Sequence, residues 1–549
     1  MKILYVNPSR IASGLDAVIK GPPLNLISLA AMVPEHDAKL TDFKVEKFQE
    51  KKFRSDLNHH DVVAITSMTP QIDSALEVAR IAKDQGCKTI VGGYHPTLDP
   101  NYVAKDLGVD YAVRGEGENT FRELIDFIDG NKYNIQEKDI DGISYMKNGE
   151  IIHNKDRALE CNLDNFPIPR HDLIRRKNYL YLGTRLDQME SSRGCPHNCT
   201  FCCIKKMWSD PNNKRMAYRT KSIKRIMQEI YSVDWKFNFL FFCEDNFTIN
   251  VKRTKKILDT IIHSGVNSEL YFSCQSRVDT LYRNPWLIDL MEKAGFRQIF
   301  LGIETVHQQS LDAMNKQNTT PKMTQKVVEM VKDRGISIFG GVIIGYPGET
   351  REMVHQTIQF VKSLKLTCVQ FTPITAFPGT PFFEEMKEKG RITSYNYKHY
   401  NLFHPMMGTD RLTNIEMYRL VAEAYASYYL GSDYIKDVAK RYCNPFSKWR
   451  WMGSSVPRYG KTVIGEAYGM FMTQGITRRA ISEDLQDLRR RADEAGTFNY
   501  LITKTPHYDP EKIREKVKAL NKKKKKKDYK EKREKKTIPQ KKEIDVLVG

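Results

Sequence analysis

The stretch "SSRGCPHNCTFCCIKK", residues 191–206, places four cysteines within nine residues. They are Cys195, Cys199, Cys202 and Cys203, and Gly194 stands directly before them. Such a cluster can be a disulfide framework, a zinc site or an iron–sulfur site. The rest of the sequence decides among these three.

Composition argues against disulfides. The chain has 549 residues, 40% of them hydrophobic, which is enough for two or three domains with substantial cores. Six of its ten cysteines lie outside the cluster and are scattered singly, as small buried hydrophobic residues are. The start, "MKILYVNPSR", lacks the features of a signal peptide, and no apolar run approaches the roughly 20 residues that span a bilayer. We therefore expect a cytoplasmic protein without a membrane span, in which disulfides are disfavoured.

The formal charge of +20 is unevenly distributed. Much of it lies in "KIREKVKALNKKKKKKDYKEKREKK", residues 512–536, which has no periodic apolar face and only Tyr529 as an aromatic residue. This pattern is typical of a solvated, disordered tail, predicted over residues 511–549. Nucleic acid is therefore an unlikely partner, although an acidic partner could use the tail for recruitment.

From Met1 to about Phe127 the chain alternates short apolar runs with helical patterns. "KILYVN", "DVVAITS", "KTIVGG" and "DYAVRGEG" are predicted strands, and the segments between them are predicted helices. Buried strands with intervening helices favour a doubly wound parallel sheet of α/β class, which binds ligands at the carboxyl ends of its strands. No G-x-G-x-x-G follows the first strand, so a dinucleotide is disfavoured. The candidate ligand-binding residues at the strand ends are Asn7, Thr66, Ser67, Gly92, Gly93 and Thr97.

The alternation returns between about residues 187 and 390. Six strand-like runs with helical stretches between them predict a full or partial (β/α)6 barrel, whose chemistry belongs at the carboxyl ends of its strands. The cysteine cluster follows the first of these runs. The predicted domains are a doubly wound sheet (1–135), a connector (136–186), the barrel (187–395), a helical C-terminal domain (396–510) and the basic tail.

The spacing of the cysteines favours iron and sulfur over zinc. Zinc sites usually add a second pair of cysteines or histidines at a distance, and none follows here. Three thiolates on one tight loop suit an iron–sulfur cube whose fourth iron stays open to a ligand. The predicted metal ligands are Cys195, Cys199 and Cys202. Cys203 would point away from its neighbour's cluster and is predicted not to be a ligand.

The C-x3-C-x-aromatic-C pattern after the first barrel strand resembles that of radical S-adenosylmethionine (SAM) enzymes. The resemblance implies a 4Fe–4S cluster, SAM bound at the open iron, a 5′-deoxyadenosyl radical, anaerobic chemistry and a reductant such as flavodoxin or ferredoxin. It implies polar contacts to the methionyl part of SAM at the end of the second strand, a ribose contact at the end of the fourth, and adenine contacts from the cysteine loop and the end of the fifth. In that order, the residues are Glu244, Asp245, Asn246, Glu304, Phe201 and Gly345.

The N-terminal region resembles the cobalamin-binding domain that precedes the barrel in one large subgroup of that family. The similar segments include "GPPLNLISLAAMV", "VGGYHPTLDP" and "VDYAVRGEGENTFRELI". This resemblance implies cobalamin as a third cofactor, held at the strand ends named above. The D-x-H-x-x-G segment of other cobalamin proteins is absent, so His95 is a poor candidate for an axial ligand of cobalt.

Members of that subgroup mostly methylate centres that are not nucleophiles. The favoured function is a C-methyltransferase that acts on an unactivated carbon through a 5′-deoxyadenosyl radical and methylcobalamin. The alternative within the family is an anaerobic cyclase of the magnesium-protoporphyrin monomethyl ester type, and the alternative of another class is a cobalamin or redox sensor. The implied substrate is a tetrapyrrole, a lipid or a protein side chain. No residue is predicted to act as a general base or nucleophile.

Overall fold

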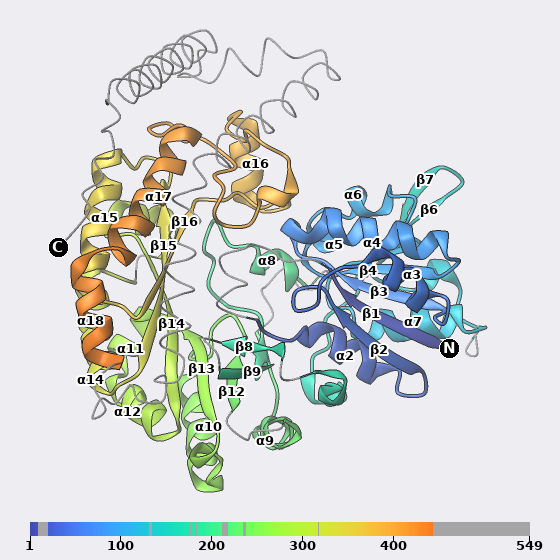
Figure 1. Ribbon diagram of the computed structural model, residues 1–549, viewed down its shortest axis with the longest axis horizontal. Coiled ribbons are helices and arrows are strands. Elements are labelled where there is room, and N and C mark those ends of the chain that lie inside the picture. Colours follow the sequence, from blue (N-terminus) through green and yellow to red (C-terminus); the bar gives the residue numbers. More distant parts are fainter. Residues whose placement is uncertain are drawn as a thin grey trace, which may run out of the picture. The chain divides into compact units, whose positions relative to one another are not determined.

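The computed structural model describes residues 1–8, 20–130, 134–175, 178–181, 184–210, 218–233, 238–316 and 318–442. The predicted basic tail and residues 443–510 of the predicted helical domain lie outside these ranges. Within them the chain forms two large sheets, each with seven strands, and a two-stranded ladder (Figure 1).

The N-terminal sheet has the order β2-β1-β3-β4-β5-β6-β7, and its first five strands are parallel. This confirms the predicted doubly wound sheet. The edge strand β2 was not predicted, because "DAKLTD" is mostly polar and only half buried. A hairpin that turns at Asn148-Gly149 extends the sheet as β6 and β7. The strands are β1 (Lys2–Asn7), β2 (Asp37–Asp42), β3 (Val62–Thr66), β4 (Lys88–Gly92), β5 (Tyr111–Val113), β6 (Ile143–Lys147) and β7 (Glu150–His153).

Helices cover both faces of this sheet because successive side chains of each strand point to opposite faces. On β1, Leu4 and Val6 join one buried cluster, while Ile3 and Tyr5 join another. The first cluster is closed by helix α4 and the second by helices α2 and α7. The helices of this region are α2 (Leu24–Met32), α3 (Glu50–Leu57), α4 (Ile72–Asp84), α5 (Tyr94–Leu98), α6 (Pro100–Ala104) and α7 (Glu118–Ile128).

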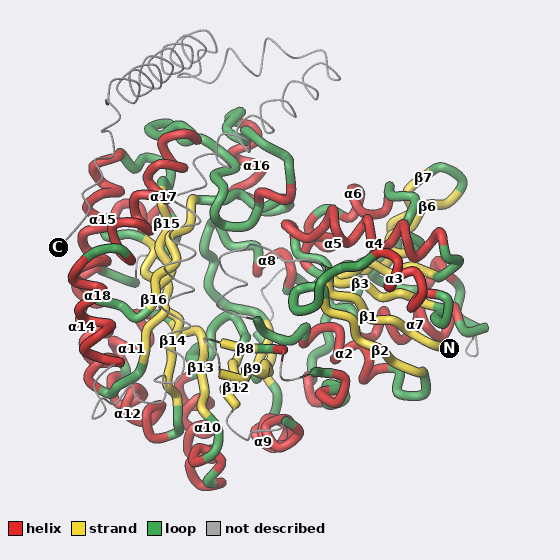
Figure 2. The backbone as a smooth tube through the Cα atoms, viewed as in Figure 1, coloured by secondary structure: helices red, strands yellow, loops and turns green. Residues whose placement is uncertain are grey.

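The second large sheet is a partial barrel of six parallel strands within the described residues, as predicted. Its order is β16-β15-β14-β13-β12-β9-β8, with the short β8 antiparallel at one edge. The two end strands are not neighbours, so the barrel is open. Figure 2 shows the strands with helices along one side. The strands are β8 (Leu180–Tyr181), β9 (Thr184–Met189), β12 (Asn238–Phe242), β13 (Tyr271–Ser276), β14 (Phe296–Glu304), β15 (Ser337–Ile344) and β16 (Cys368–Pro373).

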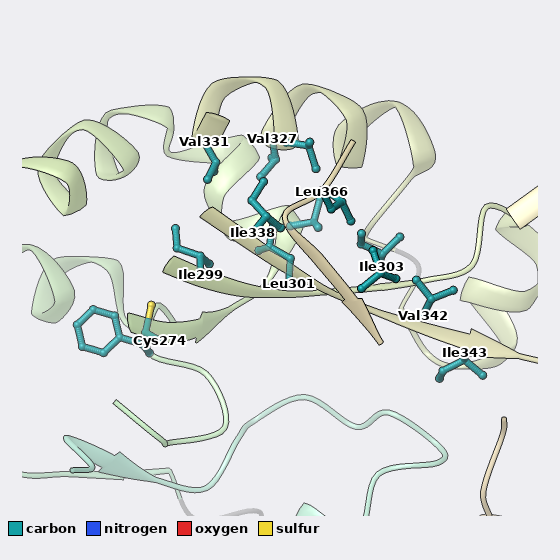
Figure 3. Close-up of a cluster of buried hydrophobic side chains, with 14 of the residues drawn as sticks. Cys274, Ile299, Leu301, Ile303, Val327, Val331, Ile338, Val342, Ile343 and Leu366 are labelled. Carbon is teal, nitrogen blue, oxygen red and sulfur yellow. The ribbon is translucent and has the colours of Figure 1, made fainter. Parts of the chain in front are cut away.

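The barrel helices begin at clear signals. Ser222, Asn250, Thr320 and Thr350 each accept a hydrogen bond from a backbone N–H in the first turn of the following helix. Figure 3 shows the packing that results, with strand residues such as Leu301 beneath α14. The helices are α9 (Ile223–Ser232), α10 (Val251–Ser264), α11 (Val278–Arg283), α12 (Pro285–Lys293), α13 (Gln308–Ala313), α14 (Pro321–Asp333), α15 (Arg351–Leu364) and α16 (Pro381–Glu388).

Tyrosines cover the open edge at β16. Helix α17 (Asn414–Tyr429), which precedes α18 (Ser432–Tyr442), packs along this strand. The Tyr429 hydroxyl accepts from the Val369 N–H at 2.8 Å and donates to the Val369 carbonyl at 2.7 Å. The Tyr425 hydroxyl accepts from the Phe371 N–H at 3.2 Å. An unpaired strand edge is prone to pair with another chain, and these phenols satisfy it from within.

The chain returns to the N-terminal sheet after the barrel. Tyr397, Tyr400 and Met406 belong to the same buried cluster as α4, and the Tyr397 hydroxyl donates to Asp99 at 2.9 Å. A segment from the predicted helical C-terminal domain thus completes the core of the N-terminal domain. Among the described helices, none is both long and apolar enough to cross a membrane.

Candidate functional site

The cysteine loop joins β10 (Ser192–Arg193), which pairs with β11 (Arg219–Thr220), to the short helix α8 (Ile204–Met207). Gly194 begins the loop with a φ of +83°, a left-handed conformation that glycine adopts without strain. The loop is fastened to the segment after α13, since the Thr200 N–H donates to the Met314 carbonyl at 3.3 Å and the Asn315 side chain donates to the Asn198 carbonyl at 2.8 Å. The first and fourth strand-end loops of the barrel are therefore tied together.

The four thiols of the loop are free and partly buried. Burial raises the pKa of Cys195 and of Cys202, and it raises the pKa of Cys203 to about 11. Within the described ranges, no three ligand side chains lie close enough to share one metal ion. A cube needs no such convergence, because each thiolate binds a different iron.

A cavity of 440 Å³ opens where the carboxyl ends of the N-terminal strands face those of the barrel. Its position at β1 and β3 is the point where the strand order reverses, which is where doubly wound sheets bind ligands. Seven of the predicted site residues line it. They are Asn7, Thr66, Ser67, Gly92, Gly93, Glu244 and Asp245.

Glycine shapes the wall after β4. Gly93 has a φ of +110°, and a Cβ atom there would lie 2.9 Å from the Ser67 carbonyl oxygen. The Asn7 side chain is held below by a 3.0 Å bond to Asp42 and a 3.2 Å bond from Gln71. The wall is therefore tightly built before any ligand is bound.

Two acidic residues line the barrel side of the cavity. Burial raises the pKa of Glu244 to about 7, although Ser191 donates to its carboxylate through the backbone N–H at 3.2 Å and through the hydroxyl. Burial, together with the nearby Glu190 carboxylate, raises the pKa of Asp245 to about 7. Both groups are thus poised to exchange a proton near neutral pH.

Besides the three predicted cysteine ligands, five other predicted site residues lie outside the cavity lining. The Thr97 hydroxyl donates to the Gly93 carbonyl at 2.8 Å and supports the wall from behind. Phe201 packs against the barrel core. The Asn246 side-chain oxygen accepts from Thr248, while its buried side-chain nitrogen has no hydrogen-bond partner among the described residues.

The remaining two of these five residues end barrel strands in left-handed conformations. Glu304, with a φ of +62°, ends β14 and forms a buried ion pair with Lys316. Gly345, with a φ of +78°, follows β15, and a Cβ atom there would lie 2.5 Å from the Met417 sulfur. A side chain at that position would be strained by the positive φ and would have to displace Met417.

Several residues of the cavity were not predicted. Tyr94 follows Gly93, and Glu116, Glu118, Glu190 and Arg193 add charge to the wall. Their only sequence signals were proximity to the quoted segments "VGGYHPT", "RGEGE" and "SSRGC". His95, in contrast, lies buried outside the lining, its ring 4.4 Å from that of Tyr397, and burial lowers its pKa to about 4.

Comparisons with known proteins agree with this architecture. The family model described as B12 binding domain matches residues 14–125, and that of the Radical SAM superfamily matches residues 189–361. An uncharacterized methyltransferase of Pyrococcus horikoshii is 33% identical over 440 residues, which are 78% of this chain and 93% of the relative. The chain belongs to the cobalamin-binding radical SAM enzymes.

Two further proteins of different kinds are similar to this radical SAM enzyme. The anaerobic magnesium-protoporphyrin IX monomethyl ester cyclase of Cereibacter sphaeroides is 25% identical, over 78% of this chain and 70% of the cyclase. The structure of a radical SAM methyltransferase from Kitasatospora setae, with cobalamin and a 4Fe–4S cluster bound, superposes with a TM-score of 0.57. It shares 17% identity and is covered over 75% of its length by 71% of this chain, which shows a common fold.

The cofactors of this radical SAM enzyme are a 4Fe–4S cluster, SAM and cobalamin, and the residues present fit them. The cysteine loop offers free thiols at the predicted spacing. The unpartnered nitrogen of Asn246, buried near the end of β12, is a donor available to a ligand. The Gly93 wall provides the close backbone approach that a large flat ligand needs.

Proposed function

We propose that this enzyme is a C-methyltransferase that acts on an unactivated carbon. The observation that carries the proposal is a cavity lined both by the cobalamin-domain strand ends and by the barrel residues Glu244 and Asp245. The proposed methylation needs a radical from SAM and a methyl group from cobalamin at the same substrate carbon. Both cofactors must therefore lie within reach of one substrate, and a shared cavity meets that need. The relative of Pyrococcus horikoshii, named a methyltransferase, supports the same reaction class.

We assign the cluster to Cys195, Cys199 and Cys202, with the fourth iron left for SAM. When bound, these cofactors supply a carbon-centred radical and a transferable methyl group, and the protein supplies binding and orientation. The loop fastening through Thr200 and Asn315 holds the thiols in place. Cys203 caps α8 through its backbone carbonyl, which accepts from the Met207 N–H at 3.3 Å, and is not a ligand.

We assign the remaining contacts residue by residue. Glu244, Asp245 and Asn246 bind the methionyl part of SAM. Glu304 binds near the ribose, with Lys316 orienting its carboxylate. The adenine lies between Phe201 and the backbone at Gly345. Asn7, Thr66, Ser67, Gly92, Gly93 and Thr97 form or support the cobalamin site.

The second candidate function is ring closure by a cyclase, and it is favoured by the relative of Cereibacter sphaeroides. A cyclase would use the same radical to oxidise its substrate and would transfer no methyl group. In either case the electrons come from a reductant such as flavodoxin or ferredoxin, and we place the enzyme in the cytoplasm.

The test is anaerobic turnover of the reduced, fully loaded enzyme with magnesium-protoporphyrin IX monomethyl ester as the probe. The methyltransferase proposal predicts S-adenosylhomocysteine among the products and no closed ring. Ring closure accompanied by 5′-deoxyadenosine, without S-adenosylhomocysteine, would establish the cyclase instead.

A further inference from the structure

A buried guanidinium joins the cysteine loop to the cobalamin-binding domain. Arg193 lies two residues before Cys195, its side chain is only 8% exposed, and all three of its nitrogens donate to carboxylates. Nε donates to Glu190, Nη1 to Glu116 and Nη2 to Glu118, each at 2.6 Å. Glu190 is in the barrel, whereas the other two follow β5 in the N-terminal sheet.

A second arginine reinforces this link. Arg219 stands opposite Arg193 in the β10–β11 ladder, and its Nη1 donates to both Glu116 oxygens at 3.0 and 2.9 Å. Both guanidiniums lie near the indole of Trp208, with ring-centroid distances of 5.6 Å for Arg193 and 5.7 Å for Arg219. The network thus combines ion pairs with cation–π contacts.

The network lies in the wall of the cavity. Arg193, Glu116, Glu118, Glu190 and Trp208 all line the 440 Å³ cavity. A guanidinium is a rigid planar fork, so three simultaneous carboxylate partners define both its place and its orientation. A change in the spacing between the cysteine loop and the β5 end would break at least one of these buried bonds, which is costly.

We propose that Arg193 is a positioning residue that sets the distance between the cluster and the cobalamin. Through Glu116 and Glu118 it holds the cysteine loop against the strand ends of the cobalamin-binding domain. The proposal rests on the two metal cofactors of the family and not on the methylation proposed above, so it stands or falls separately from that reaction.

The test compares full-length enzymes loaded with both cofactors and reduced so that the cluster and cob(II)alamin each carry an unpaired electron. Pulsed EPR measures the magnetic interaction between the two centres, and hence their distance distribution. In Arg193→Lys we expect a distribution roughly twofold broader than in the wild type, because lysine replaces the fork with a flexible point charge. Iron and cobalamin contents should stay at wild-type values.

Arg225→Lys is the matched control. The Arg225 side chain is similarly shielded, at 11% exposed, but its carboxylate partner, Glu229 at 2.9 Å, lies with it in α9. In Arg225→Lys, the distribution of distances between the cluster and the cobalt should remain as narrow as in the wild type. A narrow distribution in fully loaded Arg193→Lys would overturn the proposal.

A second variant covers the case in which Arg193→Lys loses a cofactor. Glu118→Gln removes one charge from the cobalamin-domain side and leaves Glu116 and Glu190 in place. We expect it to bind both cofactors and to broaden the distribution. If it too loses cluster or cobalamin while Arg225→Lys does not, the network is needed for folding rather than for spacing, and the proposal is wrong.

Discussion

Single residues decide the chemistry of this enzyme where burial changes their protonation. Burial raises the pKa values of Glu244 and Asp245 to about 7, so these two carboxyl groups ionise only near neutral pH. The cysteine loop was predictable from sequence because its ligand spacing is local. The Arg193 network was not, because its partners Glu116 and Glu118 lie 77 and 75 positions away in the chain.

The first prediction concerns the ligand set. Cys202→Ala should lose the cluster and reductive cleavage of SAM, because the cube would lose one of three thiolates. Cys203→Ala is the adjacent control and should retain both. Iron content and the absorbance of the reconstituted proteins measure this. Equal iron loss in the two variants would show that Cys203 is a ligand.

The second prediction concerns pH. SAM carries a permanent positive sulfonium charge, which ionised carboxylates attract and neutral ones do not. Because the folded pKa values of Glu244 and Asp245 lie near 7, both carboxylates are protonated at lower pH. The Kd for SAM should therefore rise as pH falls from 8 to 6, roughly tenfold for one lost ion pair worth about 1.4 kcal/mol. Calorimetric titration measures it.

The double variant Glu244→Gln, Asp245→Asn is the control for the pH prediction. Its affinity for SAM should be weak and nearly independent of pH in the same range. An unchanged pH dependence in that variant would mean that other groups titrate on binding.

At the scale of elements, strands and helices with buried apolar runs were predictable, and edges were not. β2 was missed because its polar, half-buried side chains show no apolar run. The β6–β7 hairpin turns at Asn148-Gly149, a pair that favours such turns, but its place in the sheet depends on a partner strand, β5. The tyrosines of α17 showed only a helical pattern, since their bonds to β16 depend on tertiary packing.

The third prediction tests that edge. Tyr429→Phe removes the hydroxyl that both donates to and accepts from Val369. Leaving these buried backbone groups unpaired should lower the free energy of unfolding by about 1–3 kcal/mol. Denaturant unfolding measures the loss, and Tyr282→Phe on α11, where the side chain is 41% exposed, should lose far less. Equal losses would contradict the role of the edge bonds.

The fourth prediction concerns the turn after β4. Gly93→Ala places a Cβ 2.9 Å from the Ser67 carbonyl oxygen in the cavity wall and should reduce cobalamin binding. Gly86→Ala is the matched control, because Gly86 also has a positive φ, +81°, but its Cβ would meet nothing within 4 Å. Both variants should lose some stability. Retention of full cobalamin affinity in Gly93→Ala would move the corrinoid away from this wall.

At the scale of the whole molecule, the N-terminal α/β domain and the barrel line one cavity and contact each other directly. Tyr397 and Tyr400, which follow the barrel, complete the core beside α4. Arg193 adds ion pairs between the barrel and the N-terminal domain, through Glu116 and Glu118. The order of domains could be predicted from alternating patterns, whereas these contacts could not, because they join residues from distant parts of the chain.

The most direct test of the central claim is the fate of the SAM methyl group. Reduced enzyme with both metal cofactors is given SAM bearing a trideuterated methyl group, without other substrate, and the corrinoid is extracted for mass spectrometry. We predict that the label appears in the corrinoid fraction together with one S-adenosylhomocysteine per labelled corrinoid. An unlabelled corrinoid, with 5′-deoxyadenosine as the only product of SAM, would contradict the assignment as a methyltransferase.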